Sequence, residues 1–179
     1  MLTITIPEQE MYNEETQEFL SYGEQTLQLQ HSLVSLSKWE SKWCKAFLSK
    51  EAKTDEEVLD YIRCMTVTQN VKPETYSRLT QENLEAINKY IDAPMTATTF
   101  SNQPQKQGGE IVTSELIYYW MISYNIPMEC QKWHLNRLLT LIRVCNVKNA
   151  PAKKMSKRDI MSRNAALNAS RRSKLNSKG

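Results

Sequence analysis

The stretch that decides the fold is Ser37-Lys38-Trp39-Glu40-Ser41-Lys42-Trp43-Cys44-Lys45-Ala46-Phe47, where the patterning changes from strand-like to helical. Ser37 and Glu40 are three residues apart, the spacing of a capping box, in which each side chain accepts a hydrogen bond from the backbone N–H of the other residue. Trp39, Trp43 and Phe47 follow at intervals of four, so they share one face of a helix. The sequence therefore predicts a helix from residue 37 whose aromatic face packs against another element.

Short strands are predicted on the N-terminal side of this stretch. Residues 2–6 and 26–31 alternate apolar and polar side chains, which is the period of a half-buried strand. Pro7 ends the first run because it has no backbone N–H to donate. Residues 11–20 are compatible either with polar turns or with an arm of a hairpin. A small β element of two or three strands is therefore expected to open the chain.

Capping signals predict more helices after the first. Thr54 and Glu57 form a second capping box ahead of residues 58–65. Pro73 suits the first position of a helix, and Thr80 is a cap for the apolar periodicity that follows it. Each of these signals marks a helix start, so several short helices are expected in this part of the chain.

Two further helices are predicted beyond a loop at residues 93–109, which is rich in Pro, Thr, Ser and Gln. Residues 115–122 are apolar on nearly every side, as is typical of a helix at the centre of a fold. Residues 129–146 carry apolar side chains at helical spacing. The short connection through Pro127 predicts that these two helices form a helical hairpin.

Together these signals predict a mainly α (α+β) fold. A helical globular domain over residues 1–147 is expected to contain the strands at about 2–30, the helices at about 37–147 and the loop at 93–109. A basic C-terminal helix or tail over residues 148–179 completes the chain. With 179 residues, of which 40% are hydrophobic, the protein is long enough for one core and too short for several.

Charge is divided unevenly along the chain. Residues 148–179 contain ten Lys and Arg and one Asp, a net charge of +9, while residues 1–147 carry a net charge of −6. A dense cationic segment attracts nucleic acid, acidic protein surfaces or anionic lipid. The candidate partner-binding residues of the segment are Arg158, Arg163, Arg171, Arg172 and Lys174.

Ser156 and Asp159 suit the start of a last helix within this basic segment. Its apolar stripe is thin, so we expect the helix to be exposed or to order against a partner. A solvated solubility tail is an open alternative. Binding to nucleic acid is another, although the segment lacks the interleaved aromatic residues that stack on single-stranded bases; such binding would weaken steeply with salt.

Cysteine usage and the chain's first residues bear on compartment and cofactors. The four cysteines are far apart and form no Cys-x-x-Cys pair, so we expect buried, reduced thiols and no metal site with His31 or His134. No apolar run approaches the roughly 18 residues of a membrane span, and the first residues lack the basic flank of a signal peptide. The sequence thus predicts a cytosolic protein without a membrane segment, cofactor or metal. The cysteines are Cys44, Cys64, Cys130 and Cys145.

Several side chains resemble parts of an active site, and for each we expect a structural role. His134 could be combined with Arg137, or with Glu129 and Cys130, but no second titratable group within helical reach forms an acid–base couple with it. Gly108-Gly109 lacks the Lys-Ser or Lys-Thr of a phosphate-binding loop. The cluster of Glu8, Glu10, Glu14 and Glu15 is expected to be a solvated face, and Tyr118, Tyr119, Trp120 and Trp133 are expected in the core. The sequence therefore predicts no enzyme.

Long stretches of the chain resemble one family of proteins. The stretches are Ser32-Leu33-Val34-Ser35-Leu36-Ser37-Lys38-Trp39-Glu40-Ser41-Lys42-Trp43, Asp60-Tyr61-Ile62-Arg63-Cys64-Met65, Ala93-Pro94-Met95-Thr96-Ala97-Thr98, Glu115-Leu116-Ile117-Tyr118-Tyr119-Trp120-Met121, Trp133-His134-Leu135-Asn136-Arg137-Leu138-Leu139-Thr140-Leu141-Ile142-Arg143 and Arg171-Arg172-Ser173-Lys174-Leu175-Asn176-Ser177-Lys178-Gly179. They resemble the tail assembly chaperone-like proteins of long-tailed bacteriophages, over nearly the whole chain.

This resemblance implies a non-enzymatic protein of the host cytoplasm that binds the tape-measure protein and the tail-tube subunits while the tail is built. We expect the helical body to cover the tape-measure protein and the basic segment to recruit tube subunits through electrostatics. Self-association stays open, as does a longer frameshifted product. Two other classes also stay open: a structural protein of the tail or neck that remains in the virion, and a nucleic-acid-binding accessory protein that acts through the basic segment.

Overall fold

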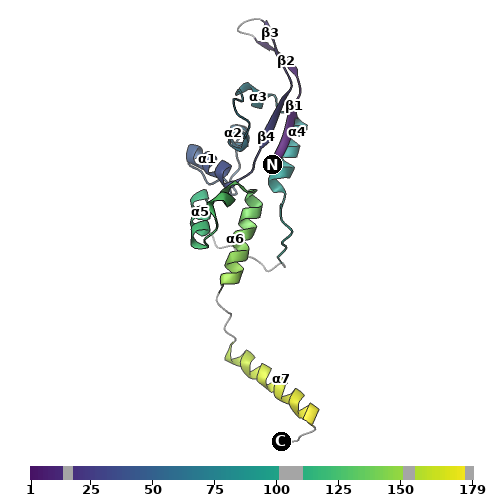
Figure 1. The fold of residues 1–179 in the computed structure, drawn as a ribbon, viewed down its shortest axis with the longest axis vertical. Helices are drawn as coiled ribbons and strands as arrows, with labels where there is room; N and C mark the ends of the chain where they lie inside the picture. The colour runs from purple at the N-terminus through teal and green to yellow at the C-terminus, as the bar shows by residue number, and fades with distance from the viewer. Residues whose placement is uncertain (14–17, 101–110, 151–155, 176–179) are drawn as a thin grey trace. The chain divides into compact units, whose positions relative to one another are not determined.

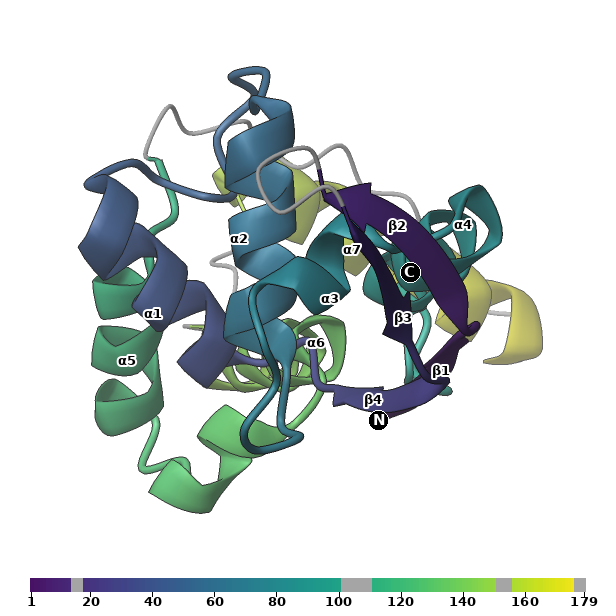
Figure 2. The ribbon, with the colours of Figure 1, turned by 90° about the horizontal axis from the view of Figure 1, so that it is seen from above.

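The computed structural model describes residues 1–13, 18–100, 111–150 and 156–175, which fall into two units, Met1–Cys145 and Asn146–Gly179. The described residues form seven α-helices, one 3₁₀ helix and four strands (Figures 1 and 2). The prediction of a mainly α fold with a small N-terminal β element is confirmed. No helix among the described residues is both long enough and apolar enough to cross a membrane.

The elements follow one another in a simple order along the chain. The strands are β1 (Leu2–Ile6), β2 (Gln9–Asn13), β3 (Glu18–Tyr22) and β4 (Gln25–Leu29). The helices are α1 (Leu33–Trp43), α2 (Asp55–Met65), α3 (Glu74–Ser77), α4 (Gln81–Asp92), α5 (Ser114–Ser123), the 3₁₀ helix η1 (Met128–Lys132), α6 (Leu135–Asn149) and α7 (Lys157–Leu175).

The four strands form two antiparallel pairs. β1 pairs with β4, with Leu2 opposite Leu29, and β2 pairs with β3, with Gln9 opposite Tyr22. The alternation predicted for β1 is confirmed, because Ile4 is buried while its neighbours in the strand are exposed. Residues 11–20, which the sequence left open, contribute to the β2–β3 hairpin, so the element has four strands where two or three were predicted.

The first helix begins earlier than its sequence predicted. Ser32 caps α1, and its side chain and that of Ser35 each accept the other's backbone N–H, at 3.4 and 2.9 Å. The predicted box of Ser37 and Glu40 is wrong, because the Glu40 carboxylate instead accepts hydrogen bonds from distant backbone N–H groups. Burial of Leu33 in the first turn draws the helix start into the core.

The other predicted capping residues, Thr54, Thr80 and Ser156, are confirmed. Thr54 and Glu57 form the capping box of α2, and Thr80 caps α4 by accepting the N–H of Asn83 at 3.2 Å. Pro73 directly precedes α3, which is only four residues long. Ser156 accepts the N–H of Asp159 at 3.1 Å ahead of α7, and no residue of α7 is buried.

α1 contributes to two hydrophobic clusters. Trp39 packs in the first, between the β1–β4 pair and helices α2 to α4, where its ring centroid lies 5.0 Å from that of Phe47. Leu33 and Leu36 pack in the second, with α5, η1 and α6. Because α1 contributes side chains to both clusters, it connects the two halves of the hydrophobic core.

We call the unit Met1–Cys145 the body. Its C-terminal helices differ from the prediction in two respects. α5 is not a central helix, because Tyr119 and Ile122 are 62% and 67% exposed and only one side packs on α1. Tyr119 is therefore wrong as a core residue, while Tyr118, Trp120 and Trp133 are partly buried. The predicted helix at 129–146 is replaced at its start by η1 and the extended Trp133, because the chain pairs there with the residues that precede α1.

Candidate interaction surfaces

The candidate basic residues all lie on α7 and all are exposed. Three of them share one face of the helix with two apolar residues, because the five positions follow at intervals of three or four. This mixed face consists of Ile160, Arg163, Leu167, Arg171 and Lys174. The helical register places the remaining two candidates, Arg158 and Arg172, on the opposite side. The structure therefore brings together three of the five predicted residues.

The apolar members of the mixed face are uncovered. Ile160 and Leu167 are 44% and 45% exposed, and they are seven residues apart, which is two turns of helix. A helix without tertiary contacts is marginally stable in water, and most helical stability in proteins comes from packing an apolar face. A partner that covers this face would therefore also stabilise the helix.

A second exposed surface is the β2–β3 hairpin, which we call the acidic arm (the described residues 8–13 and 18–24). Residues 8–24 contain six Glu and no Lys or Arg. Near its end, Tyr12 and Phe19 lie opposite each other with ring centroids 5.2 Å apart, and they are 53% and 73% exposed. Sequence analysis missed this aromatic pair, because the pair depends on the register of β2 against β3 and residues 11–20 were left open.

The Glu cluster considered in the sequence lies within the acidic arm. Glu8 and Glu10 are exposed, as expected of a solvated face, and Glu14 and Glu15 lie outside the described residues. Since side chains alternate along a strand, Glu10 shares a face with Tyr12. The arm therefore offers carboxylate and aromatic groups side by side.

Arg78 anchors the base of the acidic arm to the body. Its Nη2 donates to the carbonyl oxygens of Pro7, Tyr22 and Gly23 at 2.6, 3.3 and 3.2 Å, and its guanidinium lies 5.0 Å from the centre of the Tyr22 ring. Arg78 is buried and directly follows α3, in which Thr75 and Tyr76 are buried as well. The arm is thus fixed at its base, while Tyr12 and Phe19 farther along it are exposed to solvent.

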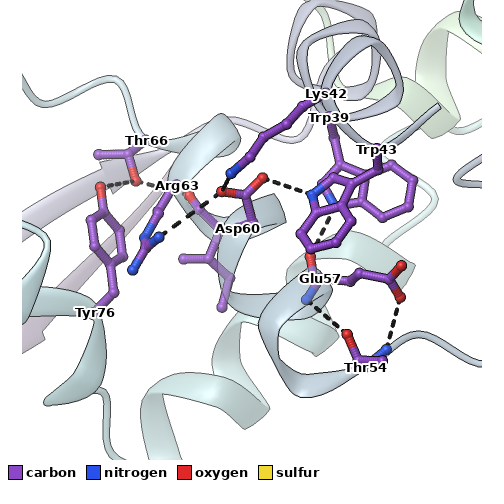
Figure 3. Close-up of polar contacts among 10 residues, drawn as sticks. Trp39, Lys42, Trp43, Thr54, Glu57, Asp60, Arg63, Thr66 and Tyr76 are labelled. Carbon is purple, nitrogen blue, oxygen red and sulfur yellow. Dashed lines mark hydrogen bonds and ion pairs between the residues drawn. The ribbon is translucent and has the colours of Figure 1, made fainter. Parts of the chain in front are cut away.

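Inside the body, Asp60 lies at the centre of a polar network between α1 and α2 (Figure 3). It accepts hydrogen bonds from Lys42 Nζ at 2.5 Å and from Trp43 Nε1 at 2.9 Å, and Arg63 lies 4.0 Å away. Burial acts to raise the pKa of this carboxyl, but the bonds from Lys42 and Trp43 outweigh it and hold the pKa below its usual value. The charged carboxylate therefore joins the two helices.

Glu57 forms a second link in the same interface. Its carboxylate accepts from Lys45 Nζ and from the N–H of Thr54, and these two contacts lower its pKa. Its backbone oxygen accepts the indole N–H of Trp39 at 2.9 Å. The contacts of this network cap α2 or hold α1 and the residue Lys45 against it, so we assign the network a structural role.

Two buried histidines meet at the junction of the two halves of the body. The rings of His31 and His134 lie 5.0 Å apart, and they are 2% and 9% exposed. The Tyr61 hydroxyl lies 2.6 Å from His31 Nδ1. His134 Nε2 donates to the Tyr90 carbonyl at 2.9 Å, and its Nδ1 accepts the Asn136 N–H at 3.3 Å. His134 is thus bonded as a neutral imidazole.

Sequence analysis considered only titratable groups within helical reach of His134. The structure supplies one from farther along the chain, because a short bridge between Ser32 and His134 brings His31 alongside. Burial and then the neighbouring His134 lower the pKa of His31 to about 4, and burial lowers the pKa of His134. Both rings are enclosed by packed side chains, which suits a structural role.

We expect the free energy of unfolding to fall by about 2 kcal/mol between pH 7 and pH 5 on account of His31. Its pKa is lowered to about 4 in the folded state, so between that value and the unfolded value of about 6.5 only the unfolded chain takes up the proton. Stability is therefore full above that window and lost as the pH falls through it. Urea unfolding at several pH values measures the slope.

The matched variant for this pH dependence is His31→Gln. It is expected to reduce the slope between pH 7 and pH 5, whatever its effect on stability at pH 7; the slope that remains comes from His134, whose pKa is also lowered by burial. The pKa values of Asp60 and Glu57 are lowered, so these carboxyl groups change stability at a lower pH and do not contribute to the slope between pH 7 and pH 5. A variant with the slope of the unaltered protein would contradict the assignment.

The cysteines differ in exposure. Cys130 is buried and Cys64 and Cys145 are partly buried, but Cys44 is exposed, so the expectation of four buried thiols is wrong for it. Cys44 is the C-cap of α1 and has a left-handed backbone conformation, with φ of 52°. All four are free, and the described residues contain no group of three His, Cys, Asp or Glu side chains placed to hold a metal ion.

Comparison of this chain with protein-family models, with curated proteins and with solved structures gives no match. The two exposed surfaces, the mixed face of α7 and the acidic arm, are therefore the features from which a function is drawn.

Proposed function

We propose that this chain binds other polypeptides without catalysing a reaction, and that it serves as a tail assembly chaperone-like protein of a long-tailed phage. The observation that carries the binding role is the mixed face of α7, where two apolar and three cationic side chains line an exposed helix. The resemblance noted in the sequence supplies the partners, which are the tape-measure protein and the tail-tube subunits.

The chemistry of the mixed face favours a polypeptide partner. Ile160 and Leu167 gain from burial against apolar side chains, by about 25 cal/mol for each Å² removed from water. The Arg and Lys side chains around them steer an acidic partner and fix its register. α7 contains no aromatic residue on which a base could stack, which disfavours single-stranded nucleic acid.

The test compares two double variants that make the same charge change on opposite sides of α7. Arg171→Glu with Lys174→Glu alters the mixed face, and Arg158→Glu with Arg172→Glu alters the other side. We expect the first to weaken capture of purified tube subunits by at least about tenfold and the second by less than about threefold. Pull-down with the full chain as bait measures both. Equal losses would show that only net charge matters and would reject the mixed face as the binding surface.

The tape-measure protein is expected to depend on the body. Removal of residues 156–179 should leave its capture within about twofold of the unaltered chain, while capture of tube subunits is lost. Co-expression followed by affinity purification distinguishes these outcomes. Loss of both partners on truncation would contradict the division of roles between body and basic segment.

A further inference from the structure

We propose that a cavity at the base of the acidic arm binds a small polar molecule through a phosphate or carboxylate group, with Arg78 and Lys72 as the cations that hold it. The cavity has a volume of about 350 Å³ and lies within the body, between the turn that joins β3 to β4 and the segment 70–78. This inference goes beyond the proposed function, because it concerns a small ligand and a surface to which α7 contributes no residue.

The observation that carries the proposal is that Arg78 is a buried cation without a countercharge. Its side chain lines the cavity, the residue is only 6% exposed, and it takes part in none of the ion pairs among the described residues. Its Nη2 donates to three backbone carbonyl oxygens, but its buried Nε has no hydrogen-bond partner in the part of the chain that the structure describes. Carbonyl groups accept hydrogen bonds without neutralising a charge, and a buried charge is costly unless it is paired. An oxyanion in the cavity supplies the charge that the guanidinium lacks.

Lys72 adds a second cation to the same cavity. It is exposed, and no ion pair of the described residues involves it. Phosphate and carboxylate are the groups that the planar guanidinium of Arg recognises best, and the ammonium of Lys adds a point charge beside it. The carbonyl oxygens of Pro7, Tyr22 and Gly23 already fix Arg78, so little side-chain entropy is lost when an anion binds.

The rest of the cavity suits a polar molecule that is larger than the anionic group alone. Its volume lies at the lower end of the range for small-molecule sites, about 300 to 1,000 Å³. Hydroxyl and amide side chains line it, and the Thr75 hydroxyl donates to the amide oxygen of Gln25 at 2.9 Å, which joins the two walls. Further hydroxyl and amide groups are contributed by Ser21 and Asn70.

Two carboxylates also line the cavity, and they give the proposal a direction that can be tested. Glu24 and Glu74 are exposed, and neither forms an ion pair with Arg78 or Lys72. Both repel an anion, so binding should strengthen when one of them is neutralised. A cationic ligand would respond in the opposite way.

The test is a titration of the full chain with inorganic phosphate and, separately, with acetate, followed by ¹H–¹⁵N NMR at constant ionic strength. For at least one anion we expect saturable shifts of the Arg78 Nε–Hε signal and of the backbone amides of Gly23 and Asn70, with a dissociation constant of about 10 mM or lower. The anion that binds more tightly shows whether the ligand carries a phosphate or a carboxylate group.

Three variants locate the binding. Lys72→Gln is expected to raise the dissociation constant at least about threefold, and Glu74→Gln is expected to lower it at least about twofold. The matched control is Lys89→Gln, which removes an exposed lysine of α4 that does not line the cavity and should leave the constant unchanged. The Lys72 variant is preferred to a change of Arg78, because Arg78 also anchors the acidic arm.

Three results would overturn the proposal: no saturable shift with either anion up to about 50 mM, equal effects of Lys72→Gln and Lys89→Gln, or weaker binding by Glu74→Gln. The second result would show an adventitious ion only. Capture of tube subunits is measured separately with the Lys72 variant. Because that variant retains the mixed face of α7, failure of anion binding does not decide the proposed function.

Discussion

Replacing Trp39 with alanine is expected to lower the free energy of unfolding by about 4 kcal/mol, since truncation of a buried Trp leaves a large cavity. Trp39 is 1% exposed, its ring packs against Phe47 and Trp43, and its indole N–H donates to the backbone oxygen of Glu57. The variant loses the burial of the indole ring, and it leaves the backbone oxygen of Glu57 without its hydrogen-bond donor. Urea denaturation followed by tryptophan fluorescence or circular dichroism gives the difference.

Trp43→Ala is the matched control for this variant. The two residues stand one turn apart on the same helix, but Trp43 is only half-buried, although its indole N–H also donates, to Asp60. We expect a loss of about 2 kcal/mol there, about half that of Trp39→Ala. Equal losses would show that the aromatic face as a whole, rather than the enclosed ring of Trp39, carries the stability.

Glu40→Ala is expected to destabilise the fold by about 3 to 5 kcal/mol, because one buried and one partly buried backbone N–H group lose their acceptor. Glu40 is 7% exposed, and its two carboxylate oxygens accept from the N–H of Phe47 at 2.9 Å and from that of Ser114 at 2.7 Å. The side chain thereby fixes the turn after α1 and the start of α5. Thermal and urea unfolding of the variant measure the loss.

Two further variants separate this role from a general effect of charge. Glu40→Gln keeps one acceptor oxygen, so an intermediate loss of about 1 to 3 kcal/mol is expected. Glu82→Ala removes an exposed carboxylate from α4 and should change stability by less than about 1 kcal/mol. If Glu40→Ala proved as mild as Glu82→Ala, the assigned hydrogen bonds would not be those that hold the fold.

Helix starts could be predicted where the cap is local. Thr54, Thr80 and Ser156 act as expected because a capping hydrogen bond joins residues three apart in the sequence. Ser37 carried the same pattern, but the side chain of Glu40 is engaged by backbone groups of which one lies 74 residues along the chain. A hydrogen bond between residues so far apart in the chain cannot be predicted from the local sequence.

The candidate surfaces could be predicted in part. The charge of the basic segment can be counted from the sequence. The mixed face could not be predicted in this way, because it depends on the helical register that places Leu167, Arg171 and Lys174 on one side of α7. The acidic arm escaped prediction because residues 11–20 fit two conformations, and pairing between β2 and β3 decides between them. The contact of His31 with His134 depends on tertiary pairing and has no sequence signal.

The tie between the start of α1 and the start of α6 has a consequence for how the protein is made. The carbonyl of His31 accepts the N–H of Leu135 at 3.0 Å, and Leu33 packs in a cluster built mainly from residues beyond 116. A ribosome adds roughly 5 to 20 residues each second, so the N-terminal half waits about 5 to 20 s for the segment that completes it. During that interval the nascent chain exposes Leu33 and Leu36, and cellular holdases would find their targets there.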